Sequence, residues 1–204
     1  MKVIIISTLL LLASATTAFG QGTNGLELYL NSGISFPSNP DEFADYWSTG
    51  FNFGGGAGYS VDPNLTLVAY FDYNDFNFDD ERFLEDYGFT GYGISITGGE
   101  ASSITLSGNL KVTLLPSPEP VRPYLLGGVG WTRISIGDVT IYGPGGSVTV
   151  EGESETAFSV LLGAGIDFTL TEGMDLFIQG GYSIAFTEEE STEIFPVKLG
   201  IKFK

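Results

Sequence analysis

The 204-residue sequence predicts an all-β fold, an eight-stranded antiparallel up-and-down β-barrel, on three observations. Eight segments alternate bulky apolar residues with small or polar ones, as β-strands do because successive side chains point to opposite faces. Long and short connections alternate along the chain, which is typical of a meander with one decorated end and one plain end. The 29 glycines and 14% aromatic residues also favour strands over helices.

The expected strands follow one another through most of the chain. They cover residues 26–36, 51–61, 67–74, 104–114, 121–135, 158–170, 176–186 and 194–204. The last strand shows the alternation best, because Phe195, Val197 and Leu199 share one face while Lys198 and Lys202 lie on the other. Such lengths suit tilted membrane strands, which need about 9–11 residues, and exceed the roughly 5–6 residues typical of soluble sheets.

In the fifth segment, residues 121–135, the alternation does not show which residues belong to which face of the strand. Its Leu125-Leu126 and Gly127-Gly128 pairs place the same residue type on both faces. The directions of Trp131 and Arg133 are therefore left unassigned.

The two strand faces differ in bulk as well as in polarity. The glycine-, serine- and threonine-rich face suits a narrow lumen crowded by eight strands, so the bulky apolar face is expected to meet lipid. Aromatic residues near the strand ends match two interfacial girdles: Phe36, Phe51, Tyr59, Tyr73, Phe158, Phe168, Phe186, Phe195 and Phe203. We therefore predict a transmembrane β-barrel. A soluble barrel or sandwich with its apolar face inward is the alternative.

The first 20 residues are typical of a secretory signal peptide. Met1-Lys2 supplies positive charge, residues 3–13 are almost entirely apolar, and Ala18-Phe19-Gly20 is a plausible cleavage site. The apolar run is shorter than the roughly 20 residues that a membrane-spanning helix needs. We expect a signal peptide over residues 1–20 and one barrel domain over residues 21–204.

Acidic residues concentrate in the four long connections, and the formal net charge of the chain is −17. These connections contain 18 of the 25 carboxylates and one base, Arg82, and cover residues 37–50, 75–100, 136–155 and 187–193. Nucleic acid is not an expected partner, because its recognition requires clustered Lys and Arg. Residues 139–142 and 147–150 flank a Gly-Pro-Gly-Gly turn and can extend the barrel as a hairpin.

No cofactor, metal or catalytic motif is found. Asp79-Asp80-Glu81 and Glu188-Glu189-Glu190 lack EF-hand spacing, so the acidic loops are expected to attract divalent cations only diffusely. The chain contains no cysteine, which excludes disulfides and thiolate metal sites, and no histidine. Because histidine is the commonest acid–base catalyst near neutral pH, the protein is not expected to be an enzyme.

Charged residues also occur on the small-residue face of the strands. They form a candidate lumen network of three acids and three bases: Glu27, Asp72, Asp167, Lys111, Lys198 and Lys202. Charges in a low-dielectric interior are costly unless paired, so equal numbers predict a neutralised network and not an open ion path. Alternatively, some lie at wet strand ends and pair with nothing. Glu27 and Lys202 should meet across the seam between the first and last strands as a partly solvated pair.

With these features the chain resembles the small eight-stranded outer-membrane β-barrels of bacteria, the OmpA- and OmpX-like group. The resemblance covers the mature chain. It includes a C-terminal assembly signal, polar-x-Gly-x-x-aromatic-x-aromatic, whose first three defined positions match Lys198, Gly200 and Phe203. The final aromatic has no counterpart, because the sequence ends at Lys204. Enzymes of this architecture rely on histidine, which this chain lacks.

The resemblance implies a location in the bacterial outer membrane, contact with outer-membrane lipid, and insertion by the barrel-assembly machinery. Outer-membrane barrels have short periplasmic turns and long external loops, so the acidic loops are expected at the cell exterior. The expected function is structural or surface-interaction, with a narrow or plugged lumen. A small pore or transport barrel for small solutes is the alternative.

Overall fold

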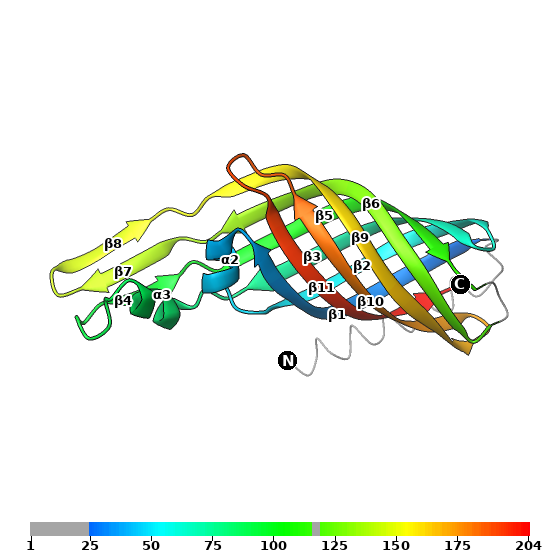
Figure 1. The fold of residues 1–204 in the computed structure, drawn as a ribbon, viewed down its shortest axis with the longest axis horizontal. Coiled ribbons are helices and arrows are strands. Elements are labelled where there is room, and N and C mark those ends of the chain that lie inside the picture. The colour runs from blue at the N-terminus through cyan, green and yellow to red at the C-terminus, as the bar shows by residue number, and fades with distance from the viewer. Residues whose placement is uncertain (1–24, 116–118) are drawn as a thin grey trace, which may run out of the picture.

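A computed structural model describes residues 25–115 and 119–204 of the chain. The expected signal peptide lies outside these residues. The described chain forms a closed antiparallel barrel of eight strands, so the fold class predicted from the sequence is confirmed (Figure 1). No helix within the described residues is both long and apolar enough to cross a membrane.

Each barrel strand pairs with the next barrel strand along the chain, and the last strand returns to the first. In chain order they are β1 (Leu26–Asn39), β2 (Gly50–Asp62), β3 (Leu65–Phe76), β5 (Ala101–Thr113), β6 (Val121–Ile136), β9 (Ser154–Thr171), β10 (Met174–Ala185) and β11 (Thr192–Phe203). The seam between β1 and β11 is a continuous antiparallel ladder from Leu28↔Phe203 to Pro37↔Ile194. Closure matters because an unpaired strand edge in lipid would leave backbone groups without hydrogen bonds.

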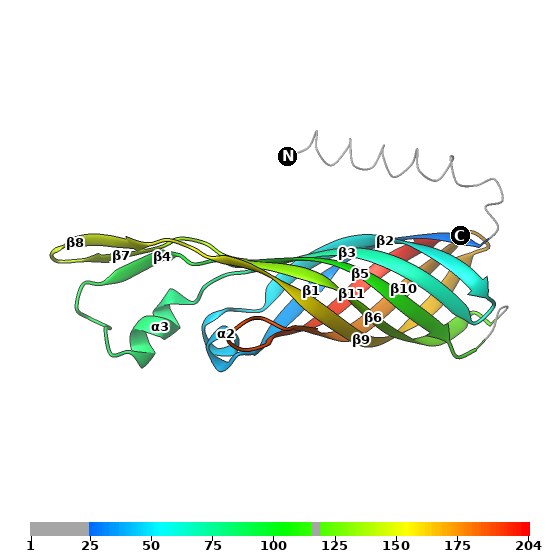
Figure 2. The ribbon, with the colours of Figure 1, turned by 90° about the horizontal axis from the view of Figure 1, so that it is seen from above.

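The long connections carry structure of their own at one end of the barrel. They contain α2 (Asp41–Tyr46), α3 (Asp80–Asp86), β4 (Ser95–Gly98), β7 (Val139–Gly143) and β8 (Gly146–Val150). The last three strands form a separate sheet in the order β4-β7-β8, which projects beyond the barrel along its long axis (Figure 2). A β7–β8 hairpin matches the expected extension, whereas the pairing of β4 with β7 was not predicted from the sequence.

Side chains alternate across the barrel wall as the sequence pattern indicates. Leu162 and Leu199 on the outer face are 63% and 52% exposed, whereas Lys111 and Lys198 on the inner face are buried. The structure also assigns the phase of β6, in which Arg122, Tyr124 and Thr132 point inward and Trp131 and Arg133 point outward. Glycine on the inner face makes room for large neighbours: a Cβ at Gly165 would overlap the ring of Tyr124.

Aromatic side chains gather on the outer face near the long-connection end of the barrel. The rings of Phe158 and Phe186 stack with centroids 6.2 Å apart, and Trp131 meets Phe158 edge-on. Phe36 and Phe195 face each other across the seam with centroids 6.5 Å apart. This arrangement corresponds to one interfacial girdle of a membrane barrel.

Replacing Leu162 with Arg should lower the free energy of unfolding by about 2–4 kcal/mol, because Leu162 lies near the middle of a lipid-facing strand. Denaturant titration of the protein in phospholipid vesicles measures this change. Val148 of β8 is the matched control, since it is 66% exposed on the projecting sheet. Arg at position 148 should alter stability by less than about 0.5 kcal/mol. Equal effects at the two positions would contradict the assignment of the outer face to lipid.

A cysteine pair should report the seam register, and the native chain offers no competing cysteine. Ser32 and Leu199 lie directly opposite each other on the outer face of β1 and β11. Cysteines at both positions should therefore crosslink under mild oxidation of the folded protein, as seen by gel mobility. Ser32→Cys with Val197→Cys is the control, because diagonal neighbours are about 7–8 Å apart and too distant for a relaxed disulfide. Efficient crosslinking of the control alone would show that the register is wrong.

Candidate functional site in the barrel lumen

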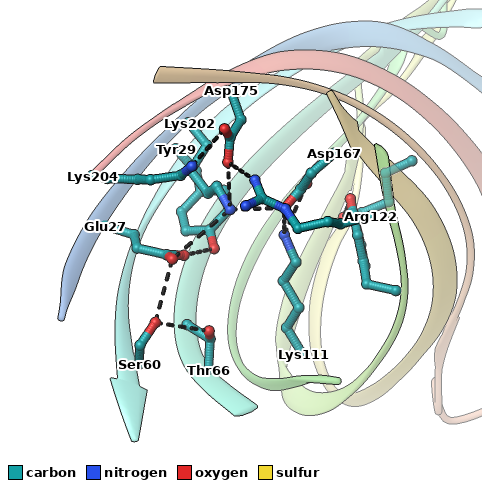
Figure 3. Close-up of polar contacts among 12 residues, drawn as sticks. Glu27, Tyr29, Ser60, Thr66, Lys111, Arg122, Asp167, Asp175, Lys202 and Lys204 are labelled. Atoms are coloured by element: carbon teal, nitrogen blue, oxygen red, sulfur yellow. Dashed lines mark hydrogen bonds and ion pairs between the residues drawn. The ribbon is translucent and has the colours of Figure 1, made fainter. Parts of the chain in front are cut away.

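Asp167 is the centre of a cluster of buried charges inside the barrel, near the end with the short turns (Figure 3). The Nζ atom of Lys111 lies 2.8 Å from Asp167 Oδ2, and the Nζ atom of Lys202 lies 2.7 Å from the same oxygen. The side chains of Asp167, Lys111 and Lys202 are only 1%, 3% and 6% exposed. These residues come from β9, β5 and β11, so the cluster connects strands from different parts of the wall.

Asp175 of β10 is the second acid of the cluster. It accepts a hydrogen bond from Arg122 and lies 2.9 Å from Lys202 Nζ and 2.6 Å from Lys204 Nζ. Strand register explains the arrangement, because Asp175 is paired with Lys202 and Arg122 with Asp167 across adjacent strands. Lys202 therefore bridges the two aspartates.

Glu27 extends the cluster to the seam. Its Oε1 atom lies 3.8 Å from Lys202 Nζ and accepts a hydrogen bond of 3.3 Å from Ser60. The hydroxyl of Tyr29 donates to the other carboxylate oxygen of Glu27. The side chains of Lys202 and Glu27 are 6% and 13% exposed. The predicted pair across the seam is therefore present, with Glu27 partly buried and Lys202 buried.

Aromatic rings enclose the charged cluster. The Nζ atom of Lys111 lies 3.8 Å from the ring centroid of Tyr124 and 5.4 Å from that of Tyr29, within range of cation–π attraction. The same apolar core contains Val68, Tyr70, Leu126, Leu161 and Phe177. A weakly polarisable environment of this kind strengthens each ion pair and makes an unpaired charge more costly.

A separate ion pair lies further along the lumen. Lys198 Nζ is 2.6 Å from Asp72 Oδ1, and both side chains are buried. The Lys198 ammonium also lies 5.7 Å from the ring centroid of Tyr70. Of the six charges predicted for the lumen, four thus lie in the cluster around Asp167 and two form this separate pair.

Sequence reasoning missed Arg122, Asp175 and Lys204 as members of the cluster. Arg122 lies on β6, where the repeated Leu and Gly pairs prevented an assignment of residues to the inner and outer faces. Asp175 precedes the expected start of its strand by one residue, but the alternation that places Phe177 inward also places Asp175 inward. With Arg122 and Asp175 included, three buried acids and the partly buried Glu27 face four buried bases, and Lys204 adds a further base at the rim.

The residues of the C-terminal signal all lie on β11 but have different surroundings. Lys198 is in the ion pair with Asp72, and Gly200 leaves room for the ring of Phe177, which a Cβ would overlap. Phe203 is paired with Leu28 on one side and Met174 on the other. Their role in barrel assembly stays a prediction.

Apolar side chains pack together at the end of the lumen beneath the long connections and form a cap. Phe43 of α2 packs against Phe76, Ala101 and Ile194. Trp47, next to α2, donates a hydrogen bond of 2.8 Å from Nε1 to the carbonyl of Gly99. The cavity below this cap has a volume of about 20 Å³, which is room for about one water molecule.

Polar side chains occupy the interior below the apolar cap. Asn52 donates a hydrogen bond of 2.8 Å to Ser35, and Ser35 donates one of 2.7 Å to Asn74. Asn74 in turn donates to Ser103 over 3.0 Å. These four residues connect β1, β2, β3 and β5, so hydrogen bonds span half of the wall. Among the described residues, no group of three or more carboxylate side chains is arranged to hold a metal ion.

Replacing Asp167 with Asn should lower the free energy of unfolding by about 3–5 kcal/mol, because it leaves the buried ammonium of Lys111 without its carboxylate partner and removes one of the partners of Lys202. Denaturant titration in vesicles measures the loss. The matched control is Asp45→Asn, which breaks the exposed 2.9 Å pair with Arg82. An exposed pair is worth less than about 1 kcal/mol. A similar small loss at both positions would show that the lumen cluster does not hold buried charge.

The sequence over residues 5–203 matches the family model described as outer membrane protein beta-barrel domain. A search of curated proteins finds no significant match. Among solved structures, Neisserial surface protein A has a TM-score of 0.61 at 15% identity, covering 90% of this chain and 99% of its own. A major outer membrane protein from Thermus thermophilus has a TM-score of 0.54 at 14% identity, covering 87% and 98%.

A third similar structure is Ail, the attachment invasion locus protein of Yersinia pestis, in complex with the heparin analogue sucrose octasulfate. It has a TM-score of 0.51 at 13% identity, covering 89% of this chain and 100% of its own. At these identities the structures support the fold alone, whereas the family model covers nearly the whole sequence. The chain therefore belongs to the outer-membrane β-barrel family and is a protein of the bacterial outer membrane.

Proposed function

We propose that this protein is a sealed barrel with a structural or surface-interaction role, carried out by its acidic loops at the cell exterior. The observation that supports the proposal most directly is the buried cluster around Asp167. An ion crossing the barrel would have to displace ammonium–carboxylate contacts of 2.7–2.8 Å within an enclosed interior. Breaking such pairs without replacing them is strongly unfavourable. The cluster therefore favours a plugged lumen over the alternative of a pore for small solutes.

The long connections form an ordered surface that is suited to interaction with a partner. Aromatic rings pack α2 against α3, because the ring centroid of Tyr46 lies 5.2 Å from that of Phe83 and 6.2 Å from that of Tyr87. Trp47 meets Phe78 edge-on at 5.2 Å. An ordered surface loses little conformational freedom on binding, which favours recognition.

The charge of the loops restricts the kind of partner. Their single base, Arg82, lies 2.9 Å from Asp45 and is largely neutralised by it. Ail was crystallised with a heparin analogue, a polyanion. The present loops, with 18 carboxylates, would repel such a ligand. We therefore expect neutral or basic partners, and diffuse attraction of divalent cations.

We infer that residues 1–20 act as a signal peptide, that the barrel-assembly machinery inserts the chain, and that the protein is not an enzyme. The absence of histidine from the sequence supports the last inference.

In planar lipid bilayers the purified protein should produce no stable steps of ion conductance, because the lumen is closed by the charged cluster and by the Phe43 cap. A general outer-membrane porin, inserted in the same lipid, is the positive control. A variant in which Lys111, Asp167, Lys202 and Phe43 are all serine removes three charges of the cluster and the ring of the cap, and so opens space at both closures. It should conduct more than the native chain. Regular conductance steps from the native protein would favour the pore alternative.

A further inference from the structure

The projecting sheet has an edge strand that lacks a neighbour within the part of the chain that the structure describes. The order β4-β7-β8 places β8 at that edge, at the end of the molecule far from the short turns (Figures 1 and 2). All five residues of β8 are exposed, including Val148 and Val150. Every barrel strand, in contrast, has two neighbours.

The β8 edge has none of the features that usually prevent another strand from pairing with it. Edge strands are normally protected by charged residues, proline, bulges or a covering element. The sequence of β8 is Gly-Ser-Val-Thr-Val, with neither charge nor proline. The opposite edge differs, because β4 has four residues, ends at Gly98, which like the following Gly99 has a positive φ, and contains the buried Ile96.

The two faces of the hairpin are chemically distinct. The register places Ile141 opposite Val148 and Val139 opposite Val150, which makes one apolar face. The other face is polar, and there the hydroxyls of Thr140 and Thr149 lie 3.0 Å apart. A strand added at β8 would complete backbone hydrogen bonds and, with apolar residues at alternate positions, would cover Val148 and Val150.

The hairpin is attached firmly to the barrel and needs little ordering before it can bind. The amide of Gly152 donates a hydrogen bond of 2.8 Å to Asp138, and that of Ile136 donates one of 2.8 Å to the carbonyl of Glu153. The amide of Gly99 donates to the carbonyl of Asp138 over 3.1 Å, which joins β4 to the same base. A preformed edge of this kind lowers the entropic cost of binding.

Charge decides between the possible occupants of the edge. Glu151 and Glu153 follow β8 directly, and the loops contain 18 carboxylates against one base. A second copy of the chain would bring an equally acidic surface against this one. From this complementarity we propose that the β8 edge docks an extended, basic peptide segment, which adds as a fourth strand to the sheet. The proposal rests on the surface-interaction role and names the class of partner.

The test uses the full-length protein in lipid nanodiscs and a fluorescent synthetic peptide, Lys-Lys-Thr-Val-Thr-Val-Thr-Val-Lys-Lys, followed by fluorescence anisotropy. Saturable binding is expected. Replacing the central valine with proline should weaken binding at least tenfold, because the peptide can no longer pair as a strand. Equal binding of the proline peptide would show that attraction is electrostatic only and would overturn the proposal.

Two protein variants with the same change in charge locate the site. Val148→Lys with Val150→Lys protects the edge and should weaken binding at least tenfold. Thr90→Lys with Tyr92→Lys adds the same charge at exposed positions of another loop and should change binding less than about threefold. Equal loss in both variants would overturn the proposal. Heat-modifiable migration on gels confirms that each variant is folded.

Two further outcomes contradict the docking of a basic segment. Failure of the peptide to bind is one. The other is dimerisation of the native protein that the Val148→Lys, Val150→Lys variant abolishes, which would make a second copy the occupant. Neither outcome involves ion conductance, so failure of this inference is distinct from failure of the sealed-barrel proposal.

Discussion

The need to pair every backbone N–H and C=O group in lipid is the constraint on which the rest of this structure depends. A sheet can meet it only by closing, and here β1 and β11 form the closing ladder from Leu28↔Phe203 onward. Closing eight strands leaves an interior just wide enough for side chains. The bulky apolar residues therefore face lipid, and glycines such as Gly165 and Gly200 give space to large rings inside.

The narrow interior in turn determines how charge is accommodated. Acids and bases from different strands are forced close together and away from solvent, so each must find a partner within the lumen. Asp167 forms ion pairs with Lys111 and Lys202, and Lys202 also pairs with Asp175. The result is a cluster of linked ion pairs near the short-turn end, while Phe43 packs against Phe76, Ala101 and Ile194 at the opposite end. The loops are free of these restrictions and contain 18 of the 25 carboxylates.

The barrel was predictable from the sequence because period-two alternation directly reports which face each residue occupies. Six lumen charges, including Lys111 and Asp72, followed from that alternation. The alternation could not be read in β6, where Leu125–Leu126 and Gly127–Gly128 put the same residue type on both faces. The inward direction of Arg122 on this strand was therefore missed. Which charges pair with each other in the lumen depends on the register between neighbouring strands, and the alternation within one strand does not contain that information. The pairing of β4 with β7 and the packing of Phe43 into the lumen are long-range contacts without a local signal.

The proposed sealing of the lumen at both ends is tested most directly by the chemical accessibility of a residue between the two closures. Ser107 is on the inner face of β5 and is 6% exposed. A cysteine at this position, the only one in the chain, is treated with a membrane-impermeant thiol reagent applied from both sides of the bilayer. If the lumen is sealed, labelling is at least a hundredfold slower than for a cysteine at the exposed Val148. Labelling of both positions at similar rates would contradict it.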